Sequence, residues 1–139
     1  MPPFQGTLGT VELRIPSKAE WVAVARLAVA AVANRLNFSI EDIEDVKLAV
    51  AEACTNCIQH AEGSDQIQIT CEAGSDGLTV RVRDFGRGTR PEGIQSRRMD
   101  EPRVGGLGVF LIRSLMDSVE YDVNPERGTN LVMTKKVAR

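Results

Sequence analysis

The hydrophobic period of this 139-residue chain alternates between that of strands and that of helices, and this alternation constrains its fold more than any other feature. Apolar and polar residues alternate over residues 10–15, in two segments between residues 67 and 82, and again after residue 118. Over residues 17–60, apolar residues instead recur every three to four positions, which indicates two helices with one buried face each. Such a chain buries its apolar faces by packing helices against one face of a mostly antiparallel sheet.

The expected elements run in the order strand, helix, helix, strand, strand, loop, helix, strand, strand. Two segments resemble capping boxes at helix starts, Ser17–Glu20 and Ser39–Asp42. The turn residues Gly74–Gly77 predict a hairpin between the strands at 67–71 and 78–82. A short helix is expected at 109–116, and strands at 119–123 and 130–135. These elements predict an α+β fold, a two-layer α/β sandwich, in one domain over residues 1–139, with residues 1–9 flexible.

Composition excludes several classes of protein. Hydrophobic residues make up 42% and charged residues 26%, which is typical of a soluble globular domain. No apolar run approaches the roughly 20 residues of a membrane helix, and the start of the sequence does not resemble a signal peptide, so we expect a cytoplasmic protein without membrane contact. A net charge of −2 and 4% aromatic residues give no indication of direct nucleic-acid binding.

A carboxylate and an amide lie one turn apart in the second expected helix. Glu52 and Asn56 are spaced i and i+4, so they share one face of that helix, beside its apolar stripe. Polar groups at the edge of a buried helix face tend to line a cleft. A carboxylate in a cleft can accept a proton from an attacking hydroxyl group, and an amide oxygen can ligate Mg²⁺. The alternative interpretation is a solvated helix flank.

Two glycine-rich segments follow. Asp84 ends an expected strand and is followed by Gly86 and Gly88, which indicates a carboxylate aimed at a ligand or else a strand-ending turn. Further along, Gly105-Gly-Leu-Gly108 leads into the short helix, where free backbone N–H groups would suit a phosphate; the alternative is a flexible helix start.

In this order and spacing, the three segments resemble the N, G1 and G2 boxes of the GHKL (histidine-kinase-like) ATPase family, which has the Bergerat fold. Residues 105–117, the Gly128-Thr129 pair and residues 133–136 are similar to the anti-sigma factor serine-protein kinases of the RsbW and SpoIIAB type. The resemblance covers residues 16–137, nearly the whole chain.

The resemblance implies a site for ATP or ADP with Mg²⁺. At the adenine end, Asp84 would accept a hydrogen bond from the adenine amino group, Gly86 and Gly88 would shape the pocket, and Thr129 would help close it. Residues 87–104 would be the ATP lid.

At the phosphate end, the resemblance implies that Asn56 holds Mg²⁺ and that Glu52 is the general base. The backbone around the phosphates would come from Gly105, Gly106, Leu107 and Gly108. Arg103 is the candidate for a contact with the γ-phosphate, because a positive group there would stabilise charge during phosphoryl transfer.

The resemblance also implies partners. The family sequesters a sigma factor, acts as a homodimer, and phosphorylates a small STAS-type anti-anti-sigma protein on serine or threonine, so that partner switching regulates transcription. Arg26, a lone charge in the first expected helix, resembles a partner-contact residue; the alternative is an ordinary surface arginine.

Other interpretations remain open at this stage. The chain could be a nucleotide-dependent binding module with weak or no kinase activity, or a switch kinase of an upstream stress-sensing complex. A zinc site is a weaker alternative, and its candidate ligands are Cys54, Cys57, His60 and Cys71.

Overall fold

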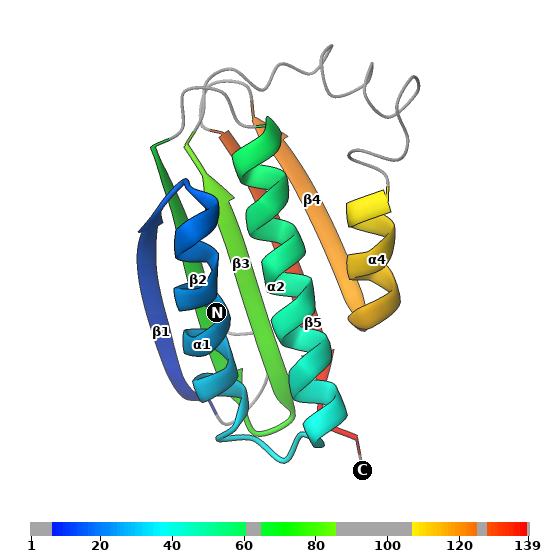
Figure 1. The fold of residues 1–139 in the computed structure, drawn as a ribbon. Coiled ribbons are helices and arrows are strands. Elements are labelled where there is room, and N and C mark those ends of the chain that lie inside the picture. The colour runs from blue at the N-terminus through cyan, green and yellow to red at the C-terminus, as the bar shows by residue number, and fades with distance from the viewer. Residues whose placement is uncertain (1–6, 61–64, 86–106, 125–127, 139) are drawn as a thin grey trace.

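The computed structural model describes residues 7–60, 65–85, 107–124 and 128–138. Its elements are β1 (Thr7–Pro16), a single 3₁₀ turn (Ala19–Trp21), α1 (Val22–Ala33), α2 (Ile40–His60), β2 (Gln66–Gly74), β3 (Gly77–Asp84), α4 (Leu107–Leu115), β4 (Ser118–Asn124) and β5 (Gly128–Lys136). Figure 1 shows these elements in one continuous body.

The five strands of the described chain form one sheet in the order β1-β2-β3-β5-β4, and every neighbouring pair is antiparallel. The last strand of the sequence, β5, therefore lies inside the sheet, between β3 and β4. This insertion brings the end of β3 next to the start of β5, where Arg83 pairs with Asn130.

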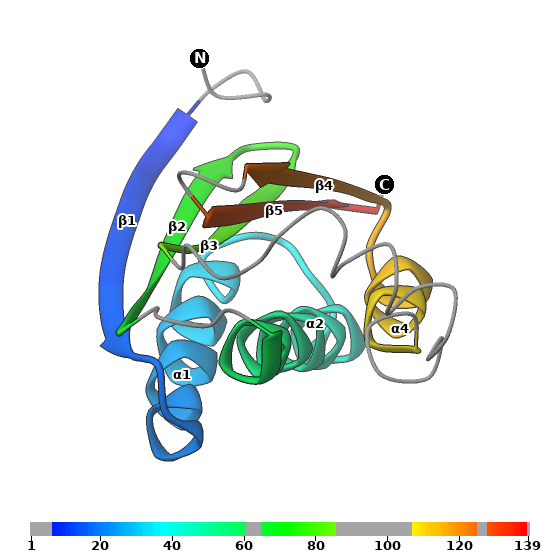
Figure 2. The same ribbon diagram turned by 90° about the horizontal axis from the view of Figure 1, so that it is seen from above.

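The helices cover one face of the sheet (Figure 2), so the α+β two-layer sandwich with a Bergerat-type arrangement is confirmed. The core lies between the two layers. Its fully buried strand residues share the alternating positions that face the helices: Ile67, Ile69, Leu78, Val80, Val82 and Met133. Both helices bury one face, as the periodicity of residues 17–60 predicts. The core residues from α1 and α2 include Ala25, Val29, Ala33, Val46, Val50 and Ala53.

The hairpin is confirmed, because β2 ends at Gly74 and β3 begins at Gly77, and these two residues pair. The capping box at the start of α2 is also confirmed. Asp42 N donates to Ser39 Oγ at 3.0 Å, and Ser39 N donates to Asp42 Oδ2 at 3.4 Å.

Two expectations about the start of the chain differ from the structure. The first strand begins at Thr7, inside the segment 1–9 that was expected to be flexible. Thr7 pairs with Gly74 and Gly9 with Ala73, with an irregularity between them. The expected capping box at Ser17 is wrong: a 3₁₀ turn follows, with Lys18 at its N-cap position and no side-chain hydrogen bond there.

None of the helices in the described part of the chain is both long and apolar enough to cross a membrane.

Candidate functional site

Residues from the three segments that resemble the nucleotide-binding boxes meet at one end of the molecule. Figure 1 shows the end of α2, the end of β3 and the start of β5 at the same end. The topology brings these ends together, because β5 lies beside β3 and α2 runs along the sheet toward the same end of these strands. The described site residues are therefore contributed by elements that are far apart in the sequence.

Asp84 is the last residue of β3, and its side chain is almost fully buried, with 2% exposed. The backbone N–H of Thr129 donates to Asp84 Oδ1 at 3.3 Å across 45 residues of sequence. Thr129 is itself buried. A buried carboxylate needs donors around it, and the Thr129 N–H is one of them.

Gly128 allows β5 to approach Asp84 this closely. Its φ of +100° is one that side-chain-bearing residues rarely adopt. A Cβ atom at this position would also overlap the carbonyl oxygen of Asp84. The approach of the two strands therefore requires glycine at residue 128.

Cys57 faces Asp84 from α2. The pKa of its thiol is raised well above the usual value, first because it is buried, then by the charge of Asp84 and by a hydrogen bond with the Asp84 side chain. The thiol therefore stays protonated and donates to the carboxylate. Asp84 is held from two sides, by α2 and by β5.

Asn56 lies beside this cluster and touches the start of α4. A Cβ atom on Gly108 would come within 2.9 Å of Asn56 Oδ1 and 3.1 Å of Nδ2. Both residues are buried. The amide of Asn56 is thus packed against the first turn of α4, where the backbone N–H groups have no acceptor within the helix. An amide oxygen placed here is a suitable ligand for Mg²⁺.

Glu52 lies one turn before Asn56 on α2 and is partly buried. Their i and i+4 spacing places the two side chains on one face of the helix. Within the described residues, no ion pair or hydrogen bond of the Glu52 carboxylate is found.

Phe85 follows Asp84 and is held by two cations. The guanidinium groups of Arg83 and Arg14 lie 4.8 Å and 5.6 Å from the centre of its ring. These contacts hold the Phe85 ring beside β1 and β3.

Several expected site residues lie outside the described residues: Gly86, Gly88, Arg103, Gly105, Gly106 and the 87–104 segment. Leu107 is the first residue of α4. Arg26 lies on α1 with its side chain exposed, as a partner contact requires.

The cysteines show no sign of a metal centre. Among the described residues, no group of histidine, cysteine or acidic side chains is arranged to hold a metal ion. All three thiols are free, and burial raises the pKa of Cys54 and of Cys71 to about 12.

Sequence reasoning missed two residues of this site, Cys57 and Gly128. Helical periodicity places Cys57 on the buried face of its helix but does not show which side chain lies opposite, and the sequence otherwise offered Cys57 only as a possible zinc ligand. Gly128 directly precedes Thr129, and a glycine at the start of a strand was the available signal for a close backbone approach.

Comparisons with known proteins agree with this geometry. The model of the histidine kinase-like ATPase domain matches residues 15–135. The serine-protein kinase RsbW of Bacillus cereus is 39% identical over 140 residues, which cover 93% of this chain and 86% of that protein. The serine-protein kinase RsbW of Halalkalibacterium halodurans is 37% identical, with 94% and 85% covered.

Proposed function

Because this chain belongs to the histidine kinase-like ATPase family and, within it, to the RsbW serine-protein kinases, we propose that it is an ATP-dependent serine-protein kinase and anti-sigma factor. The observation that carries the proposal is the packing of Asn56 against Gly108 at the start of α4, beside the buried Asp84–Thr129 pair. This arrangement offers an adenine acceptor and a phosphate end in one place.

Asp84 is the acceptor for the adenine amino group in this proposal. Its carboxylate is buried and already oriented by Thr129 N–H and by the Cys57 thiol. Hydrogen bonds from a ligand to an oriented, buried carboxylate are stronger than those to an exposed one. Guanine, which has a carbonyl oxygen at the corresponding position, would meet this carboxylate with a repelling acceptor.

Asn56 supports the phosphate end. Its amide oxygen would ligate Mg²⁺, which supplies positive charge to the phosphates when it is bound. The first turn of α4 adds backbone N–H donors and the positive end of the helix dipole. Arg103 and the glycines at 105 and 106 remain proposals for the same phosphates.

Glu52 is the proposed base for phosphoryl transfer. It takes the proton of a serine hydroxyl on a partner protein as the serine oxygen forms a bond to the γ-phosphorus. The bond between that phosphorus and the β–γ bridging oxygen breaks, and ADP leaves. Phosphoserine carries about two negative charges, so an interface that fits the unmodified serine would reject the product.

The proposed partners are a sigma factor and a STAS-type anti-anti-sigma protein, with Arg26 on the exposed face of α1 as a contact. A homodimer and a cytoplasmic location belong to the same proposal. The exposure of Arg26 supports its role as a contact, and family membership supports the rest.

The nucleotide site is tested by thermal unfolding with and without Mg·ADP. At a hundredfold excess over Kd, binding adds about 2.7 kcal/mol to the free energy of unfolding, and EDTA is expected to reduce the gain. Absence of any shift at millimolar Mg·ADP would contradict the site.

Catalysis is tested with Glu52→Gln. Loss of the base is expected to slow transfer of labelled phosphate from ATP to a serine protein in lysate by about 10²-fold or more, while the affinity for Mg·ADP stays unchanged. Glu41→Gln is the matched control, because Glu41 is exposed at the start of the same helix. Equal transfer by Glu52→Gln and wild type would favour a nucleotide-dependent binding module over a kinase that uses this base.

A further inference from the structure

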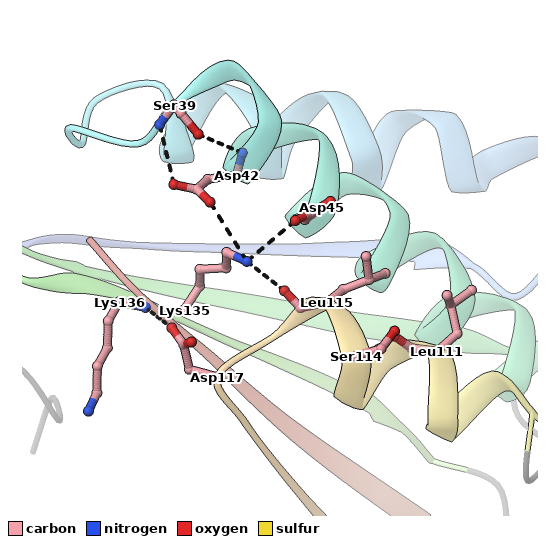
Figure 3. Close-up of polar contacts among 9 residues, drawn as sticks. All are labelled: Ser39, Asp42, Asp45, Leu111, Ser114, Leu115, Asp117, Lys135 and Lys136. Carbon is pink, nitrogen blue, oxygen red and sulfur yellow. Dashed lines mark hydrogen bonds and ion pairs between the residues drawn. The ribbon is translucent and has the colours of Figure 1, made fainter. Parts of the chain in front are cut away.

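Lys135 is a nearly buried cation that joins three elements of the fold. Its side chain is 12% exposed, and Figure 3 shows its ammonium group between α2, α4 and its own strand, β5. Nζ donates to the carbonyl oxygen of Leu115 at 2.6 Å. It lies 3.5 Å from Asp45 Oδ2 and 3.9 Å from Asp42 Oδ1. Lysine is seldom buried to this extent without paired charges.

The Leu115 carbonyl is the last one of α4, so Lys135 binds the C-terminal end of that helix. A cation at this end also matches the negative end of the helix dipole. The nine residues of α4 span about 13 Å. Lys135 contacts the C-terminal end of this short helix, and Gly108 in its first turn lies against Asn56. Both ends of α4 are thus fixed against α2, one by Gly108 and the other through Lys135.

The contacts between these ends are apolar. Ile112 is fully buried in the core, Met116 is buried just beyond the end of the helix, and apolar packing is not directional. It holds α4 onto α2 but resists sliding along the helix axis less than a hydrogen bond at the helix end does. The corner after α4 is closed nearby, because Asp117 N donates to Thr134 O at 2.9 Å and Lys136 N donates to Asp117 Oδ2 at 2.6 Å.

We propose that Lys135 is a positioning residue for nucleotide phosphates: by holding the C-terminal end of α4 to the start of α2, it keeps the first turn of α4 against Asn56. This inference rests on the proposed function, because it takes the phosphates to bind at the first turn of α4. Displacement of binding groups by about 1 Å is enough to weaken their contacts strongly.

The position of Lys135 gives the proposal a specific signature. The hydrogen bonds that Asp84 accepts from Thr129 and from Cys57 involve neither α4 nor Lys135. Loss of Lys135 is therefore expected to weaken contacts with phosphates and to leave contacts with adenine in place. A variant that only lowers stability would not separate the two.

The test compares binding of Mg·ADP and of adenosine by Lys135→Met and wild type in calorimetric titrations. We expect the affinity for Mg·ADP to fall about tenfold and the affinity for adenosine to change less than about twofold. Hydrogen exchange without nucleotide is expected to become faster in α4 than in α1.

Lys136→Met is the matched control, because it removes the same charge from the next residue, whose side chain is exposed. It is expected to bind Mg·ADP as wild type does. Lys135→Arg, which keeps charge and donors, is expected to restore most of the Mg·ADP affinity. If Lys135→Met does not fold, the double variant Asp42→Asn/Asp45→Asn removes the charges that hold Lys135 and is expected to act in the same direction more weakly.

The outcomes separate the two proposals. If wild type binds no Mg·ADP, the proposed function is wrong and this inference falls with it. If wild type binds Mg·ADP and Lys135→Met binds it equally well, or loses adenosine to the same degree, the positioning role is wrong and the proposed function stands.

Discussion

At the scale of single residues, the site depends on two glycines that have different reasons to be glycine. Gly128 combines a positive φ with a backbone atom in the place of a Cβ, so no rotation of a neighbour can relieve a substitution. At Gly108, the atoms in the way belong to the end of the Asn56 side chain, which can move. A substitution at Gly108 therefore spares the fold and disturbs the site.

Gly108→Ala is expected to leave the free energy of unfolding unchanged or to raise it, because alanine is favoured over glycine in helices by up to about 1 kcal/mol. Its Cβ atom displaces the Asn56 amide, so the affinity for Mg·ADP is expected to fall by about tenfold or more. Urea unfolding and calorimetric titration of the same sample check both parts.

Gly9→Ala is the control for this substitution, since a Cβ atom there meets nothing within 4 Å. It is expected to change neither quantity by a measurable amount. A Gly108→Ala protein with wild-type affinity for Mg·ADP would show that Asn56 has no fixed part in the site.

Gly108 and Cys57 show how far the sequence alone could lead to the site. Gly108 was expected to lie at the phosphate end because a glycine-rich segment precedes a helix. Its contact with Asn56 depends on how α4 packs on α2, and no local pattern records that packing. For Cys57 the local pattern gave the burial correctly and the partner not at all.

At the scale of elements, the start of α2 is stabilised by a reciprocal pair of hydrogen bonds between Ser39 and Asp42. The segment at Ser17 has the same residue pattern, yet a 3₁₀ turn forms there. Ser17 N donates to Asp65 O at 2.9 Å, so its backbone is engaged by the chain before β2. A tertiary contact has overridden a local signal.

Ser39→Ala is expected to lower the free energy of unfolding by about 1 kcal/mol, because the N–H of Asp42 loses its acceptor. Ser17→Ala, measured in the same urea titrations, is expected to change it by less than about 0.5 kcal/mol. A loss of similar size in both variants would mean that the hydrogen bonds at Ser39 contribute nothing specific.

At the scale of the whole molecule, the buried thiols link stability to pH. The pKa of Cys54 and that of Cys71 rise from 9.0 to about 12 on folding. Below pH 9, folded and unfolded chains both keep these protons and no effect arises. Between pH 9 and 12, the unfolded chain loses protons that the folded chain keeps, so rising pH favours unfolding.

Each thiol is expected to lower the free energy of unfolding by about 1.4 kcal/mol per pH unit as pH rises above 9. Cys71→Ala removes one thiol and is expected to reduce this slope by that amount, whatever packing it loses at pH 7. Urea titrations at pH 7.5, 9.5 and 10.5 measure the slope, and identical slopes in variant and wild type would contradict the assignment.

The architecture could be predicted further than the site. The alternating hydrophobic period predicted the elements, the hairpin and the helices on one face of the sheet, because the spacing of apolar residues indicates which face of each element is buried. No local pattern predicts that β5 lies between β3 and β4, since the sequence of β3 does not show which strand pairs with each of its two sides. That insertion is what joins Asp84 to Thr129.

The order of the strands also has a consequence for protein synthesis. Asp84 leaves the ribosome 45 residues ahead of Thr129, which at about 5–20 residues per second is roughly 2 to 9 seconds. Throughout that interval, the side of β3 that pairs with β5 in the folded protein has no strand to pair with. A nascent chain therefore cannot complete the Asp84–Thr129 contact, and with it the proposed adenine end of the nucleotide site, until β5 has emerged.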